Sequence, residues 1–239
     1  MKIIKFDEID STNNYLKENF QQFDDFTVIA ADRQTRGRGR LGKSFFSPES
    51  GIYFSLLIKD KEKLNYLDRF TIISAVAVFS ELKAYTDKKL SIKWVNDIYI
   101  ENKKLCGILT ESRIQKDNEI SYGIIGIGIN LYNPEDGFPE DIKDKAGCLF
   151  DKKPDSFLKE KIVKAICERI YMLLFKYNEE YIDIYRENSY LDNKNIKLIE
   201  NGNEQDVRAL YIDKDCRLII ENEKGVKKAL YFGDISIEI

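Results

Sequence analysis

Two neighbouring segments carry a clear strand pattern: LSIKWVNDIYIENKKLCGILTE at residues 90–111 and ISYGIIGIGINL at residues 120–131. Strands are expected at 90–94, 97–100, 105–111 and 120–131, with Asn102 in one of the tight turns. Strands that follow each other with no helix between them pair as antiparallel neighbours. The pattern therefore predicts an α+β fold, a mixed sheet with helices on one face, and not a doubly wound parallel sheet.

Upstream of these segments the chain predicts further strands and two helices. The additional strands are expected at 2–7, 28–31 and 51–58. The last of these is almost wholly apolar, which is typical of a central strand. One helix is expected at about 12–20, with Asp10 or Ser11 as its N-cap, and a second follows the apolar spacing from Leu67 to Leu82.

The C-terminal part changes its pattern twice. Three of the four prolines fall within 133–154, which predicts a loop, and a long helix is expected at about 156–187. Its apolar face consists of Leu158, Ile162, Ile166, Ile170, Leu173 and Tyr177. Turn signals then separate short alternating runs at Asn201-Gly202, 213–215, 223–225 and Gly233-Asp234, as in a five-stranded β-barrel. We therefore expect a large domain over 1–190 and a small barrel domain over 191–239.

Charge and composition restrict the function classes. The 239 residues include 38 basic and 41 acidic side chains, and a net charge of −3 excludes nucleic-acid binding by bulk charge. No apolar stretch is long enough to span a membrane, and the acidic start MKIIKFDEID does not fit a signal peptide, which predicts a cytoplasmic protein. The four dispersed cysteines predict buried, reduced thiols. With no histidine, His-containing catalytic triads and zinc sites are excluded.

A glycine- and arginine-rich loop, GRGRLGKS at 37–44, matches both the P-loop and the GxGxxG patterns. Both patterns require a helix directly after the glycines, because its N-terminus holds the phosphates. Here Phe45, Phe46, Ser47 and Pro48 follow, so both matches are rejected. The loop still carries several cations without an acid between 33 and 48, which favours an anion site over a plain solvated loop.

Four further strings accompany this loop: DSTN (10–13), KWVND (93–97), KKLCGIL (103–109) and GIGIN (126–130). In this order they resemble the biotin protein ligases, and the tail with FGDIS (232–236) resembles that family's C-terminal SH3-like β-barrel. The resemblance implies a class II aminoacyl-tRNA synthetase-like catalytic domain. It also implies that biotin reacts with ATP to biotinyl-5′-AMP and then passes to one lysine of a biotin carboxyl carrier protein or domain.

The same resemblance implies roles for individual residues. The catalytic cations are Lys104, Arg38 and Arg40. Biotin contacts are implied for Ser11, Thr12, Asn13, Gln34, Gly37, Arg38, Gly39, Arg40, Lys104, Gly107 and Gly128. Nucleotide contacts are implied for Arg40, Lys43, Phe45, Asn96, Asp97, Lys104 and Asn130, and Asp97 is also the candidate ligand for Mg²⁺.

Each role has a structural alternative. Ser11 and Thr12 can cap the first helix, Asn96 with Asp97 can form an ordinary turn, and Asn130 can simply end a strand. The pair at 103–104 can be solvated, and Trp94 is expected in the core. The chain also departs from the family's usual residues: Val95 replaces proline, Leu41 replaces a frequent arginine and Phe45 replaces a frequent tryptophan.

Two other functions stay open at this stage. One is a lipoate or octanoate ligase or transferase of the same fold, and the other is a non-catalytic nucleic-acid-binding protein that uses the arginine loop. No DNA-binding helix-turn-helix precedes residue 7, so neither repressor activity nor DNA binding is expected. No membrane partner is expected, and a homodimer is left open.

Overall fold

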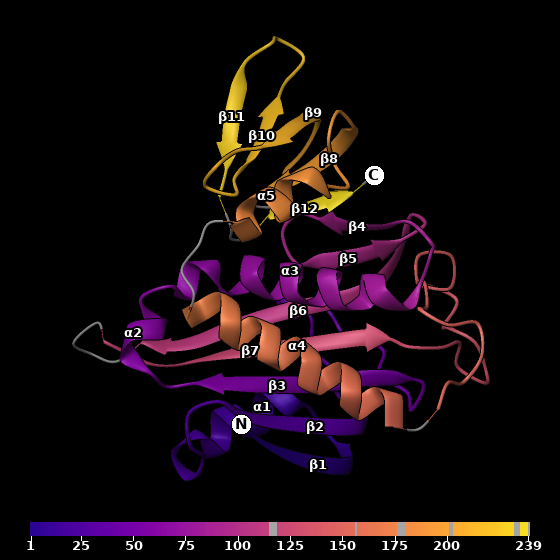
Figure 1. Ribbon diagram of the computed structural model, residues 1–239. Coiled ribbons are helices and arrows are strands. Elements are labelled where there is room, and N and C mark those ends of the chain that lie inside the picture. Colours follow the sequence, from indigo (N-terminus) through magenta and orange to yellow (C-terminus); the bar gives the residue numbers. More distant parts are fainter. Residues whose placement is uncertain (115–118, 156, 176–179, 201–202, 232–234, 239) are drawn as a thin grey trace.

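A seven-stranded mixed sheet forms the centre of the computed structural model in Figure 1, which describes all residues except 115–118, 156, 176–179, 201–202, 232–234 and 239. The strand order is β1-β2-β3-β7-β6-β5-β4. The strands are β1 (Lys2–Ile9), β2 (Thr27–Gln34), β3 (Gly51–Ile58), β4 (Leu90–Lys93), β5 (Asp97–Ile100), β6 (Lys103–Ile114) and β7 (Ile120–Asn130). Among the described strand pairs of this sheet, β1–β2 is parallel and the others are antiparallel. The predicted mixed sheet and the antiparallel order of 90–131 are confirmed.

The central strand β3 has two different faces, although every one of its residues is buried. Ile52, Phe54 and Leu56 belong to the main apolar core, whereas Leu57 belongs to a second cluster on the other side of the sheet. Because side chains alternate along a strand, Ser55 lies on the face of Leu57. A polar residue thus lies in the middle of the smaller, second face.

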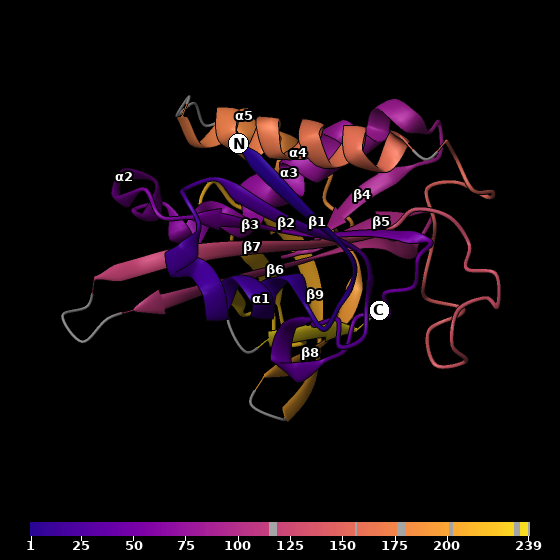
Figure 2. The same ribbon diagram turned by 90° about the horizontal axis from the view of Figure 1, so that it is seen from below.

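Helices cover both faces of this sheet. They are α1 (Thr12–Asn19), α2 (Lys61–Leu64), α3 (Phe70–Leu82), α4 (Phe157–Phe175) and α5 (Glu180–Glu187). Helices α3 and α4 pack on the main core, and Figure 2 shows α1 on the opposite face. The predicted arrangement of helices on one face therefore describes α3 and α4, while α1 contributes Leu16 to the second cluster.

The long helix predicted at about 156–187 is two helices, α4 and α5. The apolar periodicity is right for α4, where Ile162, Ile166 and Ile170 are fully buried. Helix α5 continues with a buried face of its own, including Tyr181 and Tyr185. Apolar spacing alone does not show where one helix ends and the next begins. The predicted face residue Tyr177 lies outside the described residues.

The C-terminal residues form a second, five-stranded antiparallel sheet in the order β11-β10-β9-β8-β12. Its strands are β8 (Asn195–Glu200), β9 (Asn203–Ile212), β10 (Leu218–Glu221), β11 (Lys227–Leu230) and β12 (Ile235–Glu238). The predicted number of strands is confirmed. Within the described ranges the outer strands β11 and β12 do not pair, so this sheet is an open form of the predicted barrel. The predicted turns at 201–202 and 233–234 lie outside those ranges.

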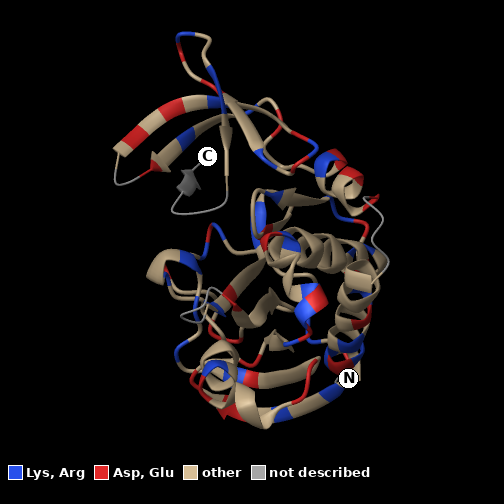
Figure 3. Cartoon of the chain, turned by 90° about the vertical axis from the view of Figure 1, so that its left-hand side faces the viewer, with Lys and Arg blue, Asp and Glu red and all other residues tan. Residues whose placement is uncertain are grey.

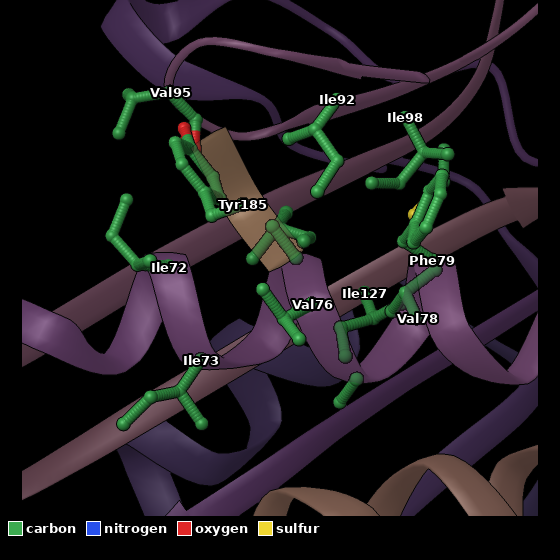
Figure 4. Packing of buried hydrophobic residues seen from close by; sticks show 14 of the residues in the cluster. Ile72, Ile73, Val76, Val78, Phe79, Ile92, Val95, Ile98, Ile127 and Tyr185 are labelled. Carbon is green, nitrogen blue, oxygen red and sulfur yellow. The ribbon is translucent and has the colours of Figure 1, made fainter. Parts of the chain in front are cut away.

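The turn between β4 and β5 is held by contacts from α5 and the second sheet. The Tyr185 hydroxyl donates to the Val95 carbonyl at 3.0 Å, and the Trp94 indole donates to the Cys216 carbonyl at 3.0 Å. Figure 4 shows Tyr185 pointing at Val95 among buried side chains of α3. The peptide bond between Trp94 and Val95 is cis. These contacts fix the turn that carries Asn96 and Asp97.

Three of the four cysteines are buried as predicted, whereas Cys148 is half-buried. All four cysteines are free, and burial raises the pKa of Cys167 to about 12 and of Cys216 to about 11, so these thiols are protonated at neutral pH. Figure 3 shows basic and acidic residues interspersed over the chain. Among the helices that the structure describes, none is long and apolar enough to cross a membrane.

The buried hydrogen bond of Tyr185 gives a test of the turn. Tyr185→Phe leaves the Val95 carbonyl without its donor in the core, so we expect the free energy of unfolding to fall by about 1–2 kcal/mol. Urea denaturation measures this change. The exposed Tyr211 is the control, and Tyr211→Phe should change stability by less than about 0.5 kcal/mol. Equal effects of the two variants would show that the Tyr185 hydroxyl does not hold the turn.

Candidate active site

A cavity of about 230 Å³ opens on the sheet face that carries α1. Its walls come from the start of α1, the loop at 38–45, the turn at 93–97 and the strands β6 and β7. Of the predicted site residues, the structure brings together Ser11, Thr12, Asn13, Gln34, Arg38, Gly39, Arg40, Lys43, Phe45, Asn96, Asp97, Lys104, Gly107 and Gly128 around this one cavity. Segments that are far apart in the sequence thus form a single site.

The N-terminus of α1 forms one end of the cavity. Ser11 caps the helix, because its side chain accepts from the Asn14 amide, and it is nevertheless part of the cavity wall. The Thr12 amide donates to Gln34 Oε1 at 2.9 Å, which joins the helix start to the end of β2. Capping and lining the cavity are therefore compatible roles for the same residues.

A buried polar network lies beneath this end. The Ser55 hydroxyl is 2.7 Å from Thr12 Oγ1 and 2.5 Å from Asn13 Oδ1, and Thr12 Oγ1 is 3.1 Å from Gln34 Oε1. Two hydroxyl groups supply only two protons for these three oxygen–oxygen contacts. The network consequently has more oxygen acceptors than hydroxyl protons. A ligand that donates hydrogen bonds would supply the missing donors.

Glycines on β6 and β7 make room for side chains that line the cavity. A Cβ atom at Gly126 would lie 2.0 Å from Asn13 Oδ1, and one at Gly128 would lie 2.7 Å from the Phe45 ring. Gly107 pairs with Gly128 in the sheet and also faces the Phe45 ring. Because Gly126 and Gly128 are two residues apart, they share one face of β7. Asn13 and Phe45 occupy the space that side chains would otherwise fill.

The glycine- and arginine-rich loop is a short hairpin. The Phe45 amide donates to the Gly37 carbonyl at 2.9 Å, and the Gly39 amide donates to the Lys43 carbonyl at 2.7 Å. Gly42 turns the chain with a φ of 72°, a conformation that glycine adopts readily. Residues 43–50 contain no helix, which confirms the rejection of the P-loop and dinucleotide patterns. Gly37 lies outside the cavity wall, and a Cβ there would meet the Phe45 carbonyl at 2.3 Å.

Of the five basic side chains that line the cavity, Arg38, Arg40 and Lys104 have the following contacts with acceptors of the protein. Arg38 contacts Glu111 at 3.2 Å and Asn14 at 2.9 Å. Arg40 donates to Asn96 Oδ1 at 3.3 Å. The Lys104 ammonium group lies 2.8 Å from Asp97 Oδ1. Arg40 and Lys104 thus lie beside the turn at 93–97, the cationic end of the cavity, whereas Arg38 lies beside the start of α1.

Asp97 is a poor candidate for a resident metal ligand. Its Oδ1 atom already faces the Lys104 ammonium, although the angle of that contact does not make a hydrogen bond. Among the described residues, no group of three or more Cys, Asp or Glu side chains is placed to hold a metal ion. A divalent cation bound to Asp97 would have to displace or oppose Lys104. The residues present therefore do not fit a protein-bound Mg²⁺.

Asn130 lies behind the cavity and not in its wall. It is buried, and its amide group donates to the Lys104 carbonyl at 3.2 Å. Leu149 in turn donates its amide to the Asn130 carbonyl. Asn130 thus supports the backbone that carries Lys104.

Local sequence patterns did not assign three residues of the site. Ser55 interrupts a largely apolar strand, and Gly126 shares the two-residue period of Gly128, so both carry a signal in the sequence. Glu111 was expected only as the end of a strand, and its sequence context carries no such signal. Burial opposes the charged form of Glu111, but hydrogen bonds from Lys17 and Asn13 outweigh burial and lower its pKa.

Comparison with known families matches nearly all of the chain. The "Biotin/lipoate A/B protein ligase family" matches residues 5–130, more than half of the chain, and the "Biotin protein ligase C terminal domain" matches residues 193–237. The first match contains the cavity, and the second contains most of the five-stranded sheet.

Individual relatives agree with these matches. The structure is similar to the biotin protein ligase from Aquifex aeolicus in complex with biotin and ATP, with 31% identity and a TM-score of 0.82 over 99% of this chain and 98% of that one. The bifunctional ligase/repressor BirA from Bacillus spizizenii is 33% identical over 88% of this chain, which spans 66% of the length of that protein. The biotin--[acetyl-CoA-carboxylase] ligase from Paracoccus denitrificans is 27% identical over 45% of each chain.

The contact between Gly126 and Asn13 predicts a stability effect. In Gly126→Ala the new methyl group would lie 2.0 Å from Asn13 Oδ1 and would displace a buried side chain from its partners. We expect the free energy of unfolding to fall by about 1–3 kcal/mol in urea denaturation. Gly39→Ala is the milder comparison, because the nearest atom to its methyl group would be the Lys43 carbonyl oxygen at 3.3 Å, and it should cost clearly less than Gly126→Ala. A neutral Gly126→Ala would contradict the tight packing of Asn13.

Proposed function

Because this chain belongs to the biotin/lipoate A/B protein ligase family, we propose that it is a biotin protein ligase. It joins biotin to ATP to give biotinyl-5′-AMP and pyrophosphate, and then transfers biotin to a lysine of a biotin carboxyl carrier domain. One observation carries the proposal. The cavity has an acceptor-rich polar end and a cationic end, and glycines line the floor between them.

The polar end favours biotin over lipoate or octanoate. The ureido ring of biotin has two N–H donors and one carbonyl acceptor, which suit the oxygen acceptors of Thr12 and Gln34 in the cavity wall. The dithiolane ring of lipoate and the alkyl chain of octanoate offer no N–H donor. They would leave buried polar groups unpaired at a cost of about 1–3 kcal/mol each.

The cationic end suits adenylation. The carboxylate of biotin is ionised at neutral pH and needs no base to attack the α-phosphate of ATP. The obstacle is the approach of two anions, which Lys104, Arg38 and Arg40 would reduce by their positive charge and by positioning the reacting atoms. We propose that Lys104 leaves Asp97 to bind the carboxylate and the α-phosphate. Pyrophosphate then departs as the acyl–phosphate bond forms.

The nucleotide would lie beside the hairpin and the turn at 93–97. We propose that Arg40, Lys43, Asn96 and Asp97 contact it from the cavity wall. Phe45 offers the flat apolar face that stacks on an adenine ring. Asn130 would act indirectly, because it holds the Lys104 backbone and does not line the cavity.

Magnesium is proposed only as part of the substrate MgATP. The phosphates of ATP can carry the ion into the site, where it neutralises charge on the triphosphate. Asp97 faces Lys104 and belongs to no group of three or more metal-ligating side chains in the described part of the chain, so we assign no resident Mg²⁺ to it.

The transfer step needs a neutral amine from the acceptor lysine, which attacks the carbonyl carbon of biotinyl-AMP and displaces AMP. We propose Asp97 as the group that orients this lysine, because Lys104 would by then be bound to the adenylate and the Asp97 carboxylate would be exposed to the incoming amine. The acceptor is proposed to be a biotin carboxyl carrier protein or domain. The reaction consumes ATP, and we propose the cytoplasm as its location.

The domain organisation is proposed on the same basis. Residues 1–190 would form the biotin- and ATP-binding domain, and 191–239 the C-terminal domain, with the boundary before β8. A homodimer is compatible with this division.

The substrate assignment can be tested by pyrophosphate exchange. Biotin with MgATP should drive the exchange of labelled pyrophosphate into ATP, whereas lipoate and octanoate should not, because only biotin supplies the N–H donors. Exchange at equal rates with lipoate would overturn the assignment.

The role of Lys104 can be tested against its neighbour. Lys104→Ala should lower the adenylation rate at least ~10²-fold, the scale of losing one charge donor to the transition state. Lys103, the preceding residue, is exposed, and Lys103→Ala should retain nearly full activity. Circular dichroism checks that both variants are folded. An active Lys104→Ala enzyme would refute the catalytic role.

A further inference from the structure

Glu111 joins two segments beside the cavity, the arginine hairpin and α1, through one carboxylate. Its Oε1 atom lies 3.2 Å from Arg38 of the hairpin and 2.5 Å from the Lys17 ammonium of α1. Its Oε2 atom accepts from Asn13 Nδ2 at 2.9 Å. Asn13 contacts Ser55 and lines the polar end of the cavity. A residue outside the cavity wall thus connects the arginine hairpin with the polar network.

We propose that Glu111 is a positioning residue for biotin binding, an inference that rests on the proposed function. Its carboxylate orients Arg38 over the cavity and fixes the Asn13 amide, and both are set before the substrate arrives. Glu111 itself does not touch the substrate.

Two features show why the hairpin needs this contact. The Arg38 side chain is 38% exposed, so without a partner it would sample many rotamers in solvent. The hairpin also contains glycines, which add conformational freedom in the unbound state. The Glu111 side chain, by contrast, is only 17% exposed and belongs to a central strand, β6. The strand therefore supplies a charged anchor for Arg38, in addition to the neutral contact of Arg38 with Asn14.

The Asn13 contact gives Glu111 a second effect. With Nδ2 donating to Glu111, the Oδ1 atom of Asn13 is directed to Ser55 as an acceptor. A rotated amide would place its NH₂ group at Ser55 and its oxygen against the carboxylate, which is repulsive. Glu111 thereby maintains the acceptor surplus that biotin is proposed to recognise.

The test compares Glu111 with an ion pair of similar exposure elsewhere. Glu81 pairs with Arg169 between α3 and α4, with side chains 19% and 45% exposed. Glu111→Gln and Glu81→Gln each remove one charge and keep the shape. In Glu111→Gln, kcat/KM for biotin in pyrophosphate exchange should fall roughly tenfold, the loss expected for one charge-assisted hydrogen bond. The KM for MgATP should stay within about twofold, and Glu81→Gln should match the wild type.

Limited digestion provides a second readout that needs no substrate. Without ligand, trypsin should cut the 33–43 segment of Glu111→Gln several times faster than that of the wild type or of Glu81→Gln, because Arg38 is released. Glu111→Asp keeps the negative charge but moves it away from Arg38 and Asn13, because the side chain is shorter. Its kcat/KM for biotin should therefore lie between those of the wild type and Glu111→Gln. This variant carries the test if Glu111→Gln does not fold.

The outcomes separate the two proposals. A wild-type enzyme without biotin-dependent exchange would refute the proposed function, while the digestion rates would still test the hold of Glu111 on the hairpin. If exchange is normal and Glu111→Gln leaves kcat/KM for biotin unchanged, or if Glu81→Gln lowers it equally, Glu111 is not a positioning residue. Equal digestion rates in wild type and Glu111→Gln would also overturn the inference.

Discussion

A single buried hydroxyl, that of Ser55, sets the arrangement of the site. It lies in a largely apolar and fully buried strand, so it must find hydrogen-bond partners within the protein. Those partners are Thr12 and Asn13 at the start of α1. The need to satisfy this group brings the helix N-terminus onto the sheet and places its polar residues where the cavity begins.

The strand β7 shows how one sequence serves a core and a site together. Ile125, Ile127 and Ile129 pack into the main core, while Gly126 and Gly128 face the cavity. The alternation of isoleucine with glycine therefore gives the two faces of one strand different roles. The isoleucine face stabilises the sheet, and the glycine face leaves room for Asn13, Phe45 and a ligand.

Local patterns predicted much of this fold. The tight turns of 90–131 predicted the antiparallel strands, and the proline that closely follows the glycine loop was enough to exclude a P-loop. The break between α4 and α5 and the opposite placement of α1 were not predictable, because both depend on which face of the sheet still needs to be covered. The contacts of Glu111 and Asn130 also depend on strand register and were beyond local patterns.

The pairing of Arg38, Arg40 and Lys104 with acceptors of the same chain has a consequence for selectivity among anions. Each of these cations already contacts a carboxylate or an amide of the same chain. A ligand must therefore replace that partner and cannot simply bind to an unpaired positive charge. Inorganic phosphate gains less from such an exchange, since it must displace partners that these cations already have. A ligand that also binds the polar end brings additional binding energy for the exchange, so the pairing favours such a ligand over small anions.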